Sequence, residues 1–236
     1  MNKSADLRFY DKKYFEGHDL LSLYLAKSLK IIMRKNNLKT VLDVGCATGR
    51  LVKFFNDNNF QAYGCDIADV AVRGAREINK NGVIFKASAT KLPFKKNSLD
   101  FITAISIIEH LTPKEAEKFI KETMRVLKPG GLIFLITPNF ATPLRLIHRQ
   151  NWFAYKDPTH VNFYTPWSLA RFLNKFGFGN FKFTFKAFYH PAFDEEFPTC
   201  FAILPKKIKI FLIFFLISSP LTFIRNSFWL LAQKLE

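Results

Sequence analysis

Short apolar segments alternate with amphipathic ones along most of the chain. Five apolar segments have the length of buried strands: 40–45, 61–66, 82–87, 98–106 and 131–138. Three segments between them repeat apolar residues at helical spacing: 49–57, 68–79 and 112–127. Strands that alternate with helices in this way predict a parallel sheet with helices on both faces.

The helix expected from 112 has the clearest start signal in the chain. Thr112 is placed as its N-cap, Pro113 occupies the first helical position, and Glu115 completes a capping box. The sequence "KPGG" at 128–131 is expected to end this helix before the next strand.

The remaining pattern extends the same architecture at both ends. It predicts helices over 19–35 and 165–178, the second capped by Thr165, and strands over 180–188 and 228–234. We therefore expect one domain over 1–236, with an α/β, Rossmann-like, doubly wound fold. Its seven-stranded sheet is mostly parallel with an antiparallel last strand, and an apolar helical insertion at 189–227 precedes that strand.

Charge and cysteine content narrow the class of protein. The chain has 236 residues and a formal net charge of +16, which favours anionic partners such as lipid surfaces or nucleic acid, although it also promotes solubility. The three cysteines form no CxxC pair, which gives no sign of a zinc site and fits a reducing compartment. The polar N-terminus lacks the apolar stretch of a signal peptide, so we expect a cytoplasmic protein.

The sequence "LDVGCATGR" joins the first strand to the following helix. Small residues at Gly45, Ala47 and Gly49 let the backbone approach a ligand at the carboxyl edge of the sheet. Asp66 ends the second strand, where a carboxylate can bind both ribose hydroxyls. The loop is not GxGxxG, because Arg50 stands where the last glycine would be, and Asp43 would repel a pyrophosphate. A cationic cofactor is therefore favoured over a dinucleotide.

These residues resemble the first motif of the class I S-adenosylmethionine-dependent methyltransferases. "VLDVGCATGR" is similar to the family's DxGxGxG, with Ala47 in place of the middle glycine, and "RVLKPGGLIFLITPN" is also typical of the family. The resemblance covers roughly 38–188 and implies S-adenosyl-L-methionine as the cofactor. It assigns the methionine part to Asp43, Gly45, Cys46, Ala47 and Gly49, the ribose to Asp66, the adenine to Ile67, Ser88 and Ala89, and a further cofactor contact to Ile105.

The sequence "ISIIEHL" at 105–111 follows the fourth strand, at the edge where methyl transfer would occur. It resembles the matching segment of the quinone-biosynthesis O-methyltransferases and of a wider group that acts on lipids and glycans. In the quinone enzymes the pattern is ExxEH, which can hold a divalent metal, but Ser106 replaces the first acid here. Glu109 and His110 are thus candidate catalytic residues without a metal; alternatively, they cap the following helix.

His160, in "DPTHVNFYTPWSL", is the third candidate catalytic residue. The segment resembles the family's "THxxxF…L" over the acceptor site, where a histidine can take the proton of an acceptor hydroxyl. The alternative is that this histidine only holds its loop in place by hydrogen bonding. Nucleic acid is not favoured as an acceptor, because the [DNS]PP[YFW] motif of base methylation is missing after the fourth strand.

The segment 208–224 is apolar apart from Lys209 and lies in the insertion before the last strand. Lys206, Lys207 and Arg225 flank it, which suits anionic lipid head groups, and "SSP" at 218–220 would break a helix. Three partners can bury it: a membrane interface, a second subunit or the protein's own core. If 228–234 is the last strand of the sheet, the segment cannot cross a membrane once, and we expect an apolar hairpin.

Together these features predict an enzyme that methylates a hydroxyl on a hydrophobic or lipid-linked acceptor. A quinone precursor and a lipid-linked glycan both fit. We expect peripheral attachment to the inner face of the cell membrane through residues 206–225. The alternatives are a soluble small-molecule or glycan methyltransferase that forms a homodimer through the apolar segment, and a non-catalytic membrane-binding adaptor that keeps the fold.

Overall fold

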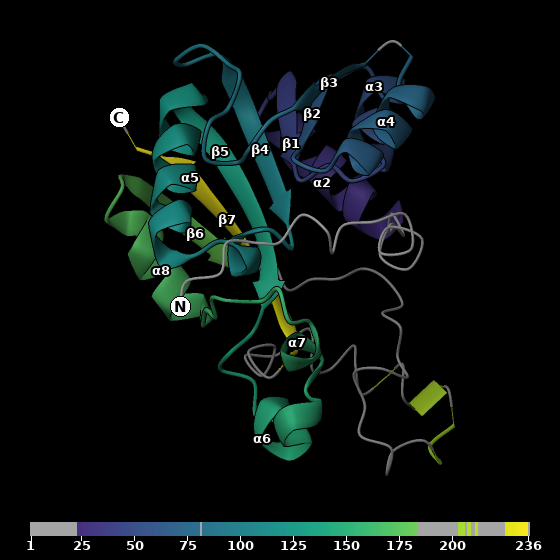
Figure 1. Ribbon diagram of the computed structural model, residues 1–236, viewed down its shortest axis with the longest axis vertical. Coiled ribbons are helices and arrows are strands. Elements are labelled where there is room, and N and C mark those ends of the chain that lie inside the picture. The colour runs from purple at the N-terminus through teal and green to yellow at the C-terminus, as the bar shows by residue number, and fades with distance from the viewer. Residues whose placement is uncertain are drawn as a thin grey trace.

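The computed structural model describes residues 23–80, 82–183, 203–205, 207, 208, 211 and 225–235. They build one seven-stranded sheet with helices on both of its faces (Figure 1). The strands are β1 (Thr40–Val44), β2 (Gln61–Asp66), β3 (Val83–Lys86), β4 (Leu99–Ile105), β5 (Leu127–Pro138), β6 (Phe178–Phe183) and β7 (Ser227–Lys234). Their order in the sheet is β3-β2-β1-β4-β5-β7-β6.

The last strand is the antiparallel one, as the sequence predicts. β3, β2, β1, β4 and β5 pair in parallel, whereas β7 lies between β5 and β6 and pairs antiparallel with both. β6 therefore runs in the direction of β5. The carboxyl ends of six strands and the start of β7 meet at one edge of the sheet, which confirms the Rossmann-like class.

The helices form two layers around the sheet (Figure 1). They are α2 (Leu23–Lys35), α3 (Arg50–Asp57), α4 (Asp69–Ile78), α5 (Pro113–Val126), α6 (Leu144–His148), α7 (Phe153–Lys156) and α8 (Pro166–Asn174), with 3-10 turns η2 (Ile108–His110) and η3 (Arg149–Asn151). α2, α3 and α4 contribute to one apolar cluster, and α5 and α8 to the other.

Alternation along each strand explains why both faces are covered. On β1, Val41 packs into the cluster with α2 to α4, and its neighbour Leu42 packs into the cluster with α5 and α8. Because the strands are apolar on both faces, helices must cover each face of the sheet, which gives the three-layer arrangement.

Both predicted helix caps are present. Thr112 and Glu115 form the capping box of α5, and Thr165 forms one with Ser168 at the start of α8. The alternative that Glu109 and His110 cap the helix after them is therefore wrong. The bounds 19–35 were expected for the first helix; Leu23–Lys35 is confirmed, and 19–22 lie outside the described residues.

Two predicted boundaries are wrong by four residues, and the strand predicted from 180 starts two residues earlier, at Phe178. β5 starts at Leu127 rather than at 131, because Leu127 already pairs with Leu99 of β4 before a register shift. "KPGG" is thus part of an irregular strand start. α8 ends at Asn174 rather than at 178, where Gly177 turns the chain at a φ of 91° so that Phe178 can begin β6.

The expected insertion at 189–227 is for the most part outside the described residues. Of the apolar segment 208–224, the structure describes only Ile208 and Phe211, so the hairpin expected there stays a prediction. No helix in the described part of the chain combines the length and the apolar character needed to cross a membrane.

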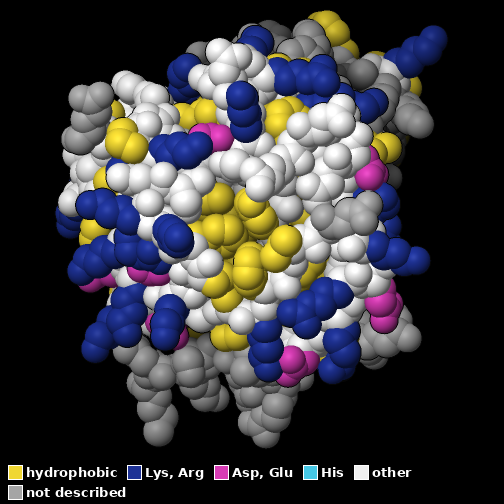
Figure 2. All heavy atoms as spheres, turned by 90° about the horizontal axis from the view of Figure 1, so that it is seen from above, with side chains coloured by type: hydrophobic (Ala, Val, Ile, Leu, Met, Phe, Trp, Pro, Cys, Tyr) yellow, Lys and Arg dark blue, Asp and Glu magenta, His cyan; other side chains and the backbone are white. Residues whose placement is uncertain are grey.

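The basic charge is visible on the surface at the edge where β4 and β5 begin. Figure 2 shows this face, with many Lys and Arg side chains around an apolar patch and few Asp and Glu side chains. The acids of the candidate site, by contrast, are buried at the opposite edge of the sheet.

Gly49 starts α3 and supports a specific stability test. Its φ is 76°, and an added Cβ would lie 2.6 Å from Asn79 Nδ2 and 3.2 Å from the backbone of Ala75. We expect Gly49→Ala to lower the free energy of unfolding by about 2–4 kcal/mol, through backbone strain and overpacking.

Gly74→Ala, in the interior of α4, is the matched control. Among the described residues its Cβ would meet only Thr48, with Cγ2 and Cβ at an ordinary 3.6 and 3.8 Å, so the change should raise stability by about 0.5–1 kcal/mol. Urea unfolding of both variants measures the contrast. Equal effects of the two substitutions would contradict the close packing of α3 against α4 at Gly49.

Candidate active site

The loop between β1 and α3 turns back over the end of β2. The amides of Gly45 and Cys46 both donate to the Cys65 carbonyl, at 2.8 and 3.0 Å. Gly45, Ala47 and Gly49 have φ values of 73°, 46° and 76°, so the loop relies on left-handed backbone at three positions. This places its backbone at the carboxyl edge, where the sequence expects the cofactor.

Asp66 holds that loop in place. One carboxylate oxygen accepts from the Ala47 amide at 3.0 Å, and the other accepts from the Ala68 amide at 2.9 Å. Burial raises the pKa of Asp66 above its ordinary value, and these hydrogen bonds oppose that shift. The predicted ribose ligand thus also fastens the loop after β1 to the start of α4.

Asp43 is the second buried acid beside the loop. Its Oδ1 accepts a 2.7 Å hydrogen bond from Thr103 Oγ1 on β4, a partner that sequence reasoning missed. Burial raises the pKa of Asp43 to about 7, and the nearby Asp66 adds to the shift against the effect of Thr103. Two buried acids that disfavour each other's charge create a site where a cation is stabilised.

The other predicted cofactor residues line the same edge. Cys46 is buried, and burial raises the pKa of its thiol, so it is uncharged at neutral pH. Ile67, directly after β2, is 44% exposed and available for an apolar contact. Ser88 Oγ lies 2.9 Å from Thr90 Oγ1, beside Ala89 in the loop after β3. Ile105 ends β4.

Gly45 is required by a residue that sequence reasoning missed. A Cβ at this position would collide with the end of the Ile107 side chain. The glycine thus lets the segment after β4 pack directly onto the loop after β1. This contact connects the expected cofactor half of the site to the acceptor half.

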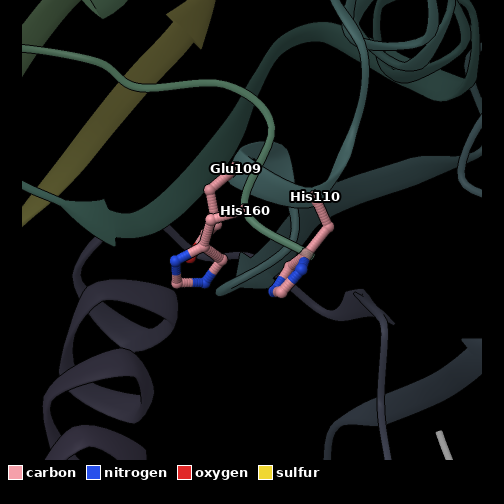
Figure 3. Close-up of side chains that lie close together, drawn as sticks. All are labelled: Glu109, His110 and His160. Carbon is pink, nitrogen blue, oxygen red and sulfur yellow. The ribbon is translucent and has the colours of Figure 1, made fainter. Parts of the chain in front are cut away.

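Glu109, His110 and His160 form a cluster beyond the end of β4 (Figure 3). The first two lie in η2, and His160 comes from the loop between α7 and α8. One ligand atom of each lies within 4.8 Å of the others, and the two imidazole rings are 4.7 Å apart between centroids. The structure therefore brings together the three residues that the sequence proposes for catalysis.

Glu109 is fully enclosed. Its Oε2 accepts from Thr137 Oγ1 at 3.1 Å, and its backbone carbonyl accepts from the amides of Val161 and Asn162. Oε1 is buried and has no hydrogen-bond partner in the described part of the chain. Burial raises the pKa of Glu109 to about 8, so the carboxyl is mostly protonated at neutral pH.

His160 is oriented by a hydrogen bond to the short helix α7. Its Nδ1 lies 2.8 Å from the Ala154 carbonyl of α7. Because a carbonyl oxygen only accepts, Nδ1 carries the hydrogen and Nε2 carries the lone pair of the neutral ring. Nε2 lies 3.8 Å from Asp157 Oδ2. One ring nitrogen thus holds the loop, and the other can accept a proton.

Comparisons to known proteins identify the family of the chain and agree with its fold. Residues 8–182 match a family model described as a methyltransferase domain. The chain belongs to the class I S-adenosylmethionine-dependent methyltransferases. The structure also shares its fold with a SAM-dependent methyltransferase from Thermotoga maritima, described as a possible histamine N-methyltransferase: the TM-score is 0.63, the sequence identity 19%, and the coverage 97% of each chain.

Curated relatives of this methyltransferase differ in acceptor. A ubiquinone biosynthesis O-methyltransferase from Idiomarina loihiensis is 29% identical over 147 residues, which is 56% of this chain and 58% of that protein. A probable tRNA methyltransferase 9B from Mus musculus is 34% identical over 96 residues, or 40% of this chain and 21% of that protein. The chain therefore matches less than two thirds of the length of these relatives.

The residues of this methyltransferase fit S-adenosyl-L-methionine as the cofactor. The cofactor carries an ammonium and a sulfonium group, and the raised pKa values of Asp43 and Asp66 reflect buried acids that a cation would stabilise. The left-handed loop at 45–49 brings backbone groups to the same edge. When bound, the cofactor supplies the methyl group.

The acceptor cluster also has donors that fit a divalent metal. Glu109 Oε1 lacks a hydrogen-bond partner in the part that the structure describes, and two histidines stand beside it. The sequence predicts no metal, on the ground that Ser106 replaces the first acid of ExxEH, and that stays a prediction. His160, from a distant segment, is the third donor that the motif alone does not reveal.

Aromatic packing supports the loop that carries His160. Trp152 is 1% exposed, and its ring lies 5.0 Å from that of Tyr155, which lies 5.5 Å from Phe163. Trp152 Nε1 donates to Asn226 Oδ1 at 3.0 Å, just before β7. The short helices α6 and α7, which the sequence pattern did not predict, extend beyond the carboxyl ends of β4 and β5 (Figure 1).

The raised pKa of Asp43 generates a test of cofactor binding. The free protein holds a proton on Asp43 below about pH 7, and a bound cation favours the ionised form. Affinity for S-adenosylmethionine should therefore rise between pH 5.5 and 7, by up to about tenfold per pH unit. Proton release should be measurable by titration calorimetry in buffers of different ionisation enthalpy.

Asp43→Asn is the matched variant, because its side-chain oxygen can still accept from Thr103. It should bind more weakly and lose most of the pH dependence over this range. A wild-type affinity that stays constant from pH 5.5 to 7 would contradict the role of Asp43.

Proposed function

We propose that this methyltransferase methylates a hydroxyl on a hydrophobic or lipid-linked acceptor at a membrane surface. A quinone precursor and a lipid-linked glycan are the acceptor classes that fit. The observation that carries the proposal is His160 at the carboxyl edge, with its Nε2 lone pair next to the Asp157 carboxylate. This arrangement suits removal of a proton from a hydroxyl.

The proposed mechanism assigns separate roles to the cluster. His160 Nε2 accepts the hydroxyl proton as the acceptor oxygen attacks the methyl group, and Asp157 at 3.8 Å stabilises the imidazolium that forms. Glu109, protonated at neutral pH, can donate a hydrogen bond toward the acceptor. Burial of Glu109 and His110 keeps water from competing for the methyl group. Alignment of the two reactants supplies much of the rate.

The short helices α6 and α7, at the same edge of the sheet, support an apolar acceptor. Leu146 and Ile147 on α6 are 66% and 62% exposed, and Phe153 on α7 is 45% exposed. No Asp or Glu occurs from 123 to 156, whereas Arg145 and Arg149 lie beside these apolar residues. Exposed apolar side chains with basic neighbours suit an anionic lipid interface.

Topology adds support for the membrane. β6 ends and β7 begins at the carboxyl edge, because the two strands are antiparallel neighbours. The connection that contains the apolar segment 208–224 therefore leaves and re-enters the sheet at the edge where the acceptor cluster lies. We propose that residues 206–225 hold the enzyme at the inner face of the cytoplasmic membrane, with dimer formation through this segment as the alternative.

The catalytic role of His160 can be measured with a polyprenylated catechol in phosphatidylglycerol vesicles as acceptor probe. His160→Gln should lower kcat by about a hundredfold while S-adenosylmethionine affinity stays unchanged. His148→Gln, on α6 outside the cluster, is the matched control and should retain activity. A soluble catechol and total tRNA are tested in parallel. Methylation of tRNA but not of the vesicle-bound catechol would overturn the proposed acceptor class.

Membrane attachment can be measured by vesicle flotation. Lys206→Glu/Lys207→Glu should reduce binding to phosphatidylglycerol vesicles by about tenfold or more, since each basic residue near the surface contributes about 1 kcal/mol. Lys95→Glu/Lys96→Glu makes the same charge change at the opposite edge of the sheet and should bind like the wild type. Equal flotation of all three proteins would reject the membrane role, and a dimer detected by sedimentation would then favour the alternative.

A further inference from the structure

Thr159 lies between a carboxylate and a histidine of the acceptor cluster. Its hydroxyl oxygen is 2.8 Å from His110 Nδ1 and donates to Asp157 Oδ1. Its amide donates to the same Asp157 oxygen at 2.8 Å. Thr159 is 6% exposed, so these contacts are shielded from water.

The hydrogens in the series Asp157–Thr159–His110 can be assigned by counting donors. Asp157 and Thr159 share the shortest of these contacts, and an ionised carboxylate only accepts, so the single hydroxyl hydrogen of Thr159 points to Asp157. The Thr159 oxygen then has only lone pairs left for His110. The hydrogen between them must therefore be carried by His110 Nδ1.

The ionisation of Asp157 is consistent with this count. Burial would raise the pKa of Asp157, but hydrogen bonds from the Thr159 hydroxyl and amide and the nearby histidines lower it below its ordinary value. The carboxylate is therefore charged at neutral pH and attracts the hydroxyl hydrogen.

We infer that Thr159, held by Asp157, is a positioning residue that keeps a hydrogen on His110 Nδ1 and thereby fixes the orientation of the His110 ring in the acceptor cluster. The inference rests on the proposed role of this cluster in acceptor methylation. Its central claim, the tautomer of His110, can be measured without any acceptor.

A single carboxylate would then serve both histidines. Asp157 Oδ1 acts on His110 through Thr159, and Oδ2 lies 3.8 Å from His160 Nε2. His160 is the same tautomer for a different reason, its bond to the Ala154 carbonyl. The two rings are 4.7 Å apart and tilted by 60°. Two imidazoles that are each held through Nδ1 thus lie next to one another in the cluster.

This arrangement matters for each role that the cluster can have. A ring nitrogen that accepts a proton or a hydrogen bond from an acceptor hydroxyl needs a lone pair, and so does one that binds a metal ion. The Nε2–H tautomer of His110 would direct a hydrogen to that position instead. Partners on the far side of a histidine ring typically change activity or metal affinity by about 10–100-fold.

Thr159→Val removes the hydroxyl and keeps the shape of the side chain, and Thr159→Ser keeps the hydroxyl. Long-range ¹H–¹⁵N correlation spectra of ¹⁵N-histidine-labelled protein report which ring nitrogen carries the hydrogen. The His110 signals are assigned with His110→Gln. Calorimetric binding of S-adenosylmethionine by each variant confirms that it is folded.

We expect the Nδ1–H tautomer for His110 in the wild type and in Thr159→Ser. Thr159→Val should shift His110 to the Nε2–H tautomer or to a mixture, and turnover of the vesicle-bound catechol should fall by about tenfold or more without a change in S-adenosylmethionine affinity. An Nε2–H tautomer in the wild type, or an unchanged tautomer in Thr159→Val, would overturn the inference. If no variant methylates the catechol, the proposed acceptor is wrong, and the spectra still decide the role of Thr159.

Discussion

The antiparallel pairing of β7 between β5 and β6 is the constraint on which the acceptor side of the molecule depends. At its start, the Asn226 carbonyl accepts from the Asn139 amide at 2.7 Å, and the Asn226 side chain accepts from Trp152 Nε1. These two bonds hold Asn139, just after β5, and Trp152, just before α7, to the same residue. His160 takes its orientation from Ala154 of α7, the helix that follows Trp152. The residue just before the last strand therefore helps to position a histidine more than sixty positions earlier in the sequence.

The cofactor side depends on a different balance, between burial and charge. Asp66 spends both carboxylate oxygens on the amides of Ala47 and Ala68, and Asp43 is held by Thr103. These bonds offset part of the desolvation that raises both pKa values. Asp66 thus stabilises a loop that has left-handed backbone at three positions, although burial disfavours the ionised form of both acids. A bound cation would favour that ionised form.

The sequence allowed the architecture to be predicted because its signals are local. Thr112, Pro113 and Glu115 mark a helix start through neighbours on the same turn, and short apolar segments mark the buried strands. α6 and α7 could not be predicted in this way, since each is at most five residues long and depends on the packing of Trp152. The same holds for the partners of the site: Thr103, Thr137 and Ile107 act across strands, and their roles follow only from register. Asp157 and Thr159 were within a quoted motif, but their link to His110 spans 49 positions.

Similarity to other proteins indicates the fold and the cofactor, whereas the geometry of the site bears on the acceptor. Relatives named for tRNA and for ubiquinone biosynthesis are both similar to this chain, so the likeness carries the fold and the cofactor rather than the acceptor. The acceptor has to be argued from the carboxyl edge. There the acidic groups are enclosed, His110 and His160 are each held through Nδ1, and the exposed residues after β5 include Leu146, Ile147 and Arg149. A hydroxylated lipid would need a proton acceptor close to exposed apolar residues, and in the proposed function His160 and the exposed Leu146, Ile147 and Phe153 take these roles. The proposed proton acceptor and these apolar residues lie at one edge of the sheet, and this coincidence supports the proposal of a lipid-linked hydroxyl.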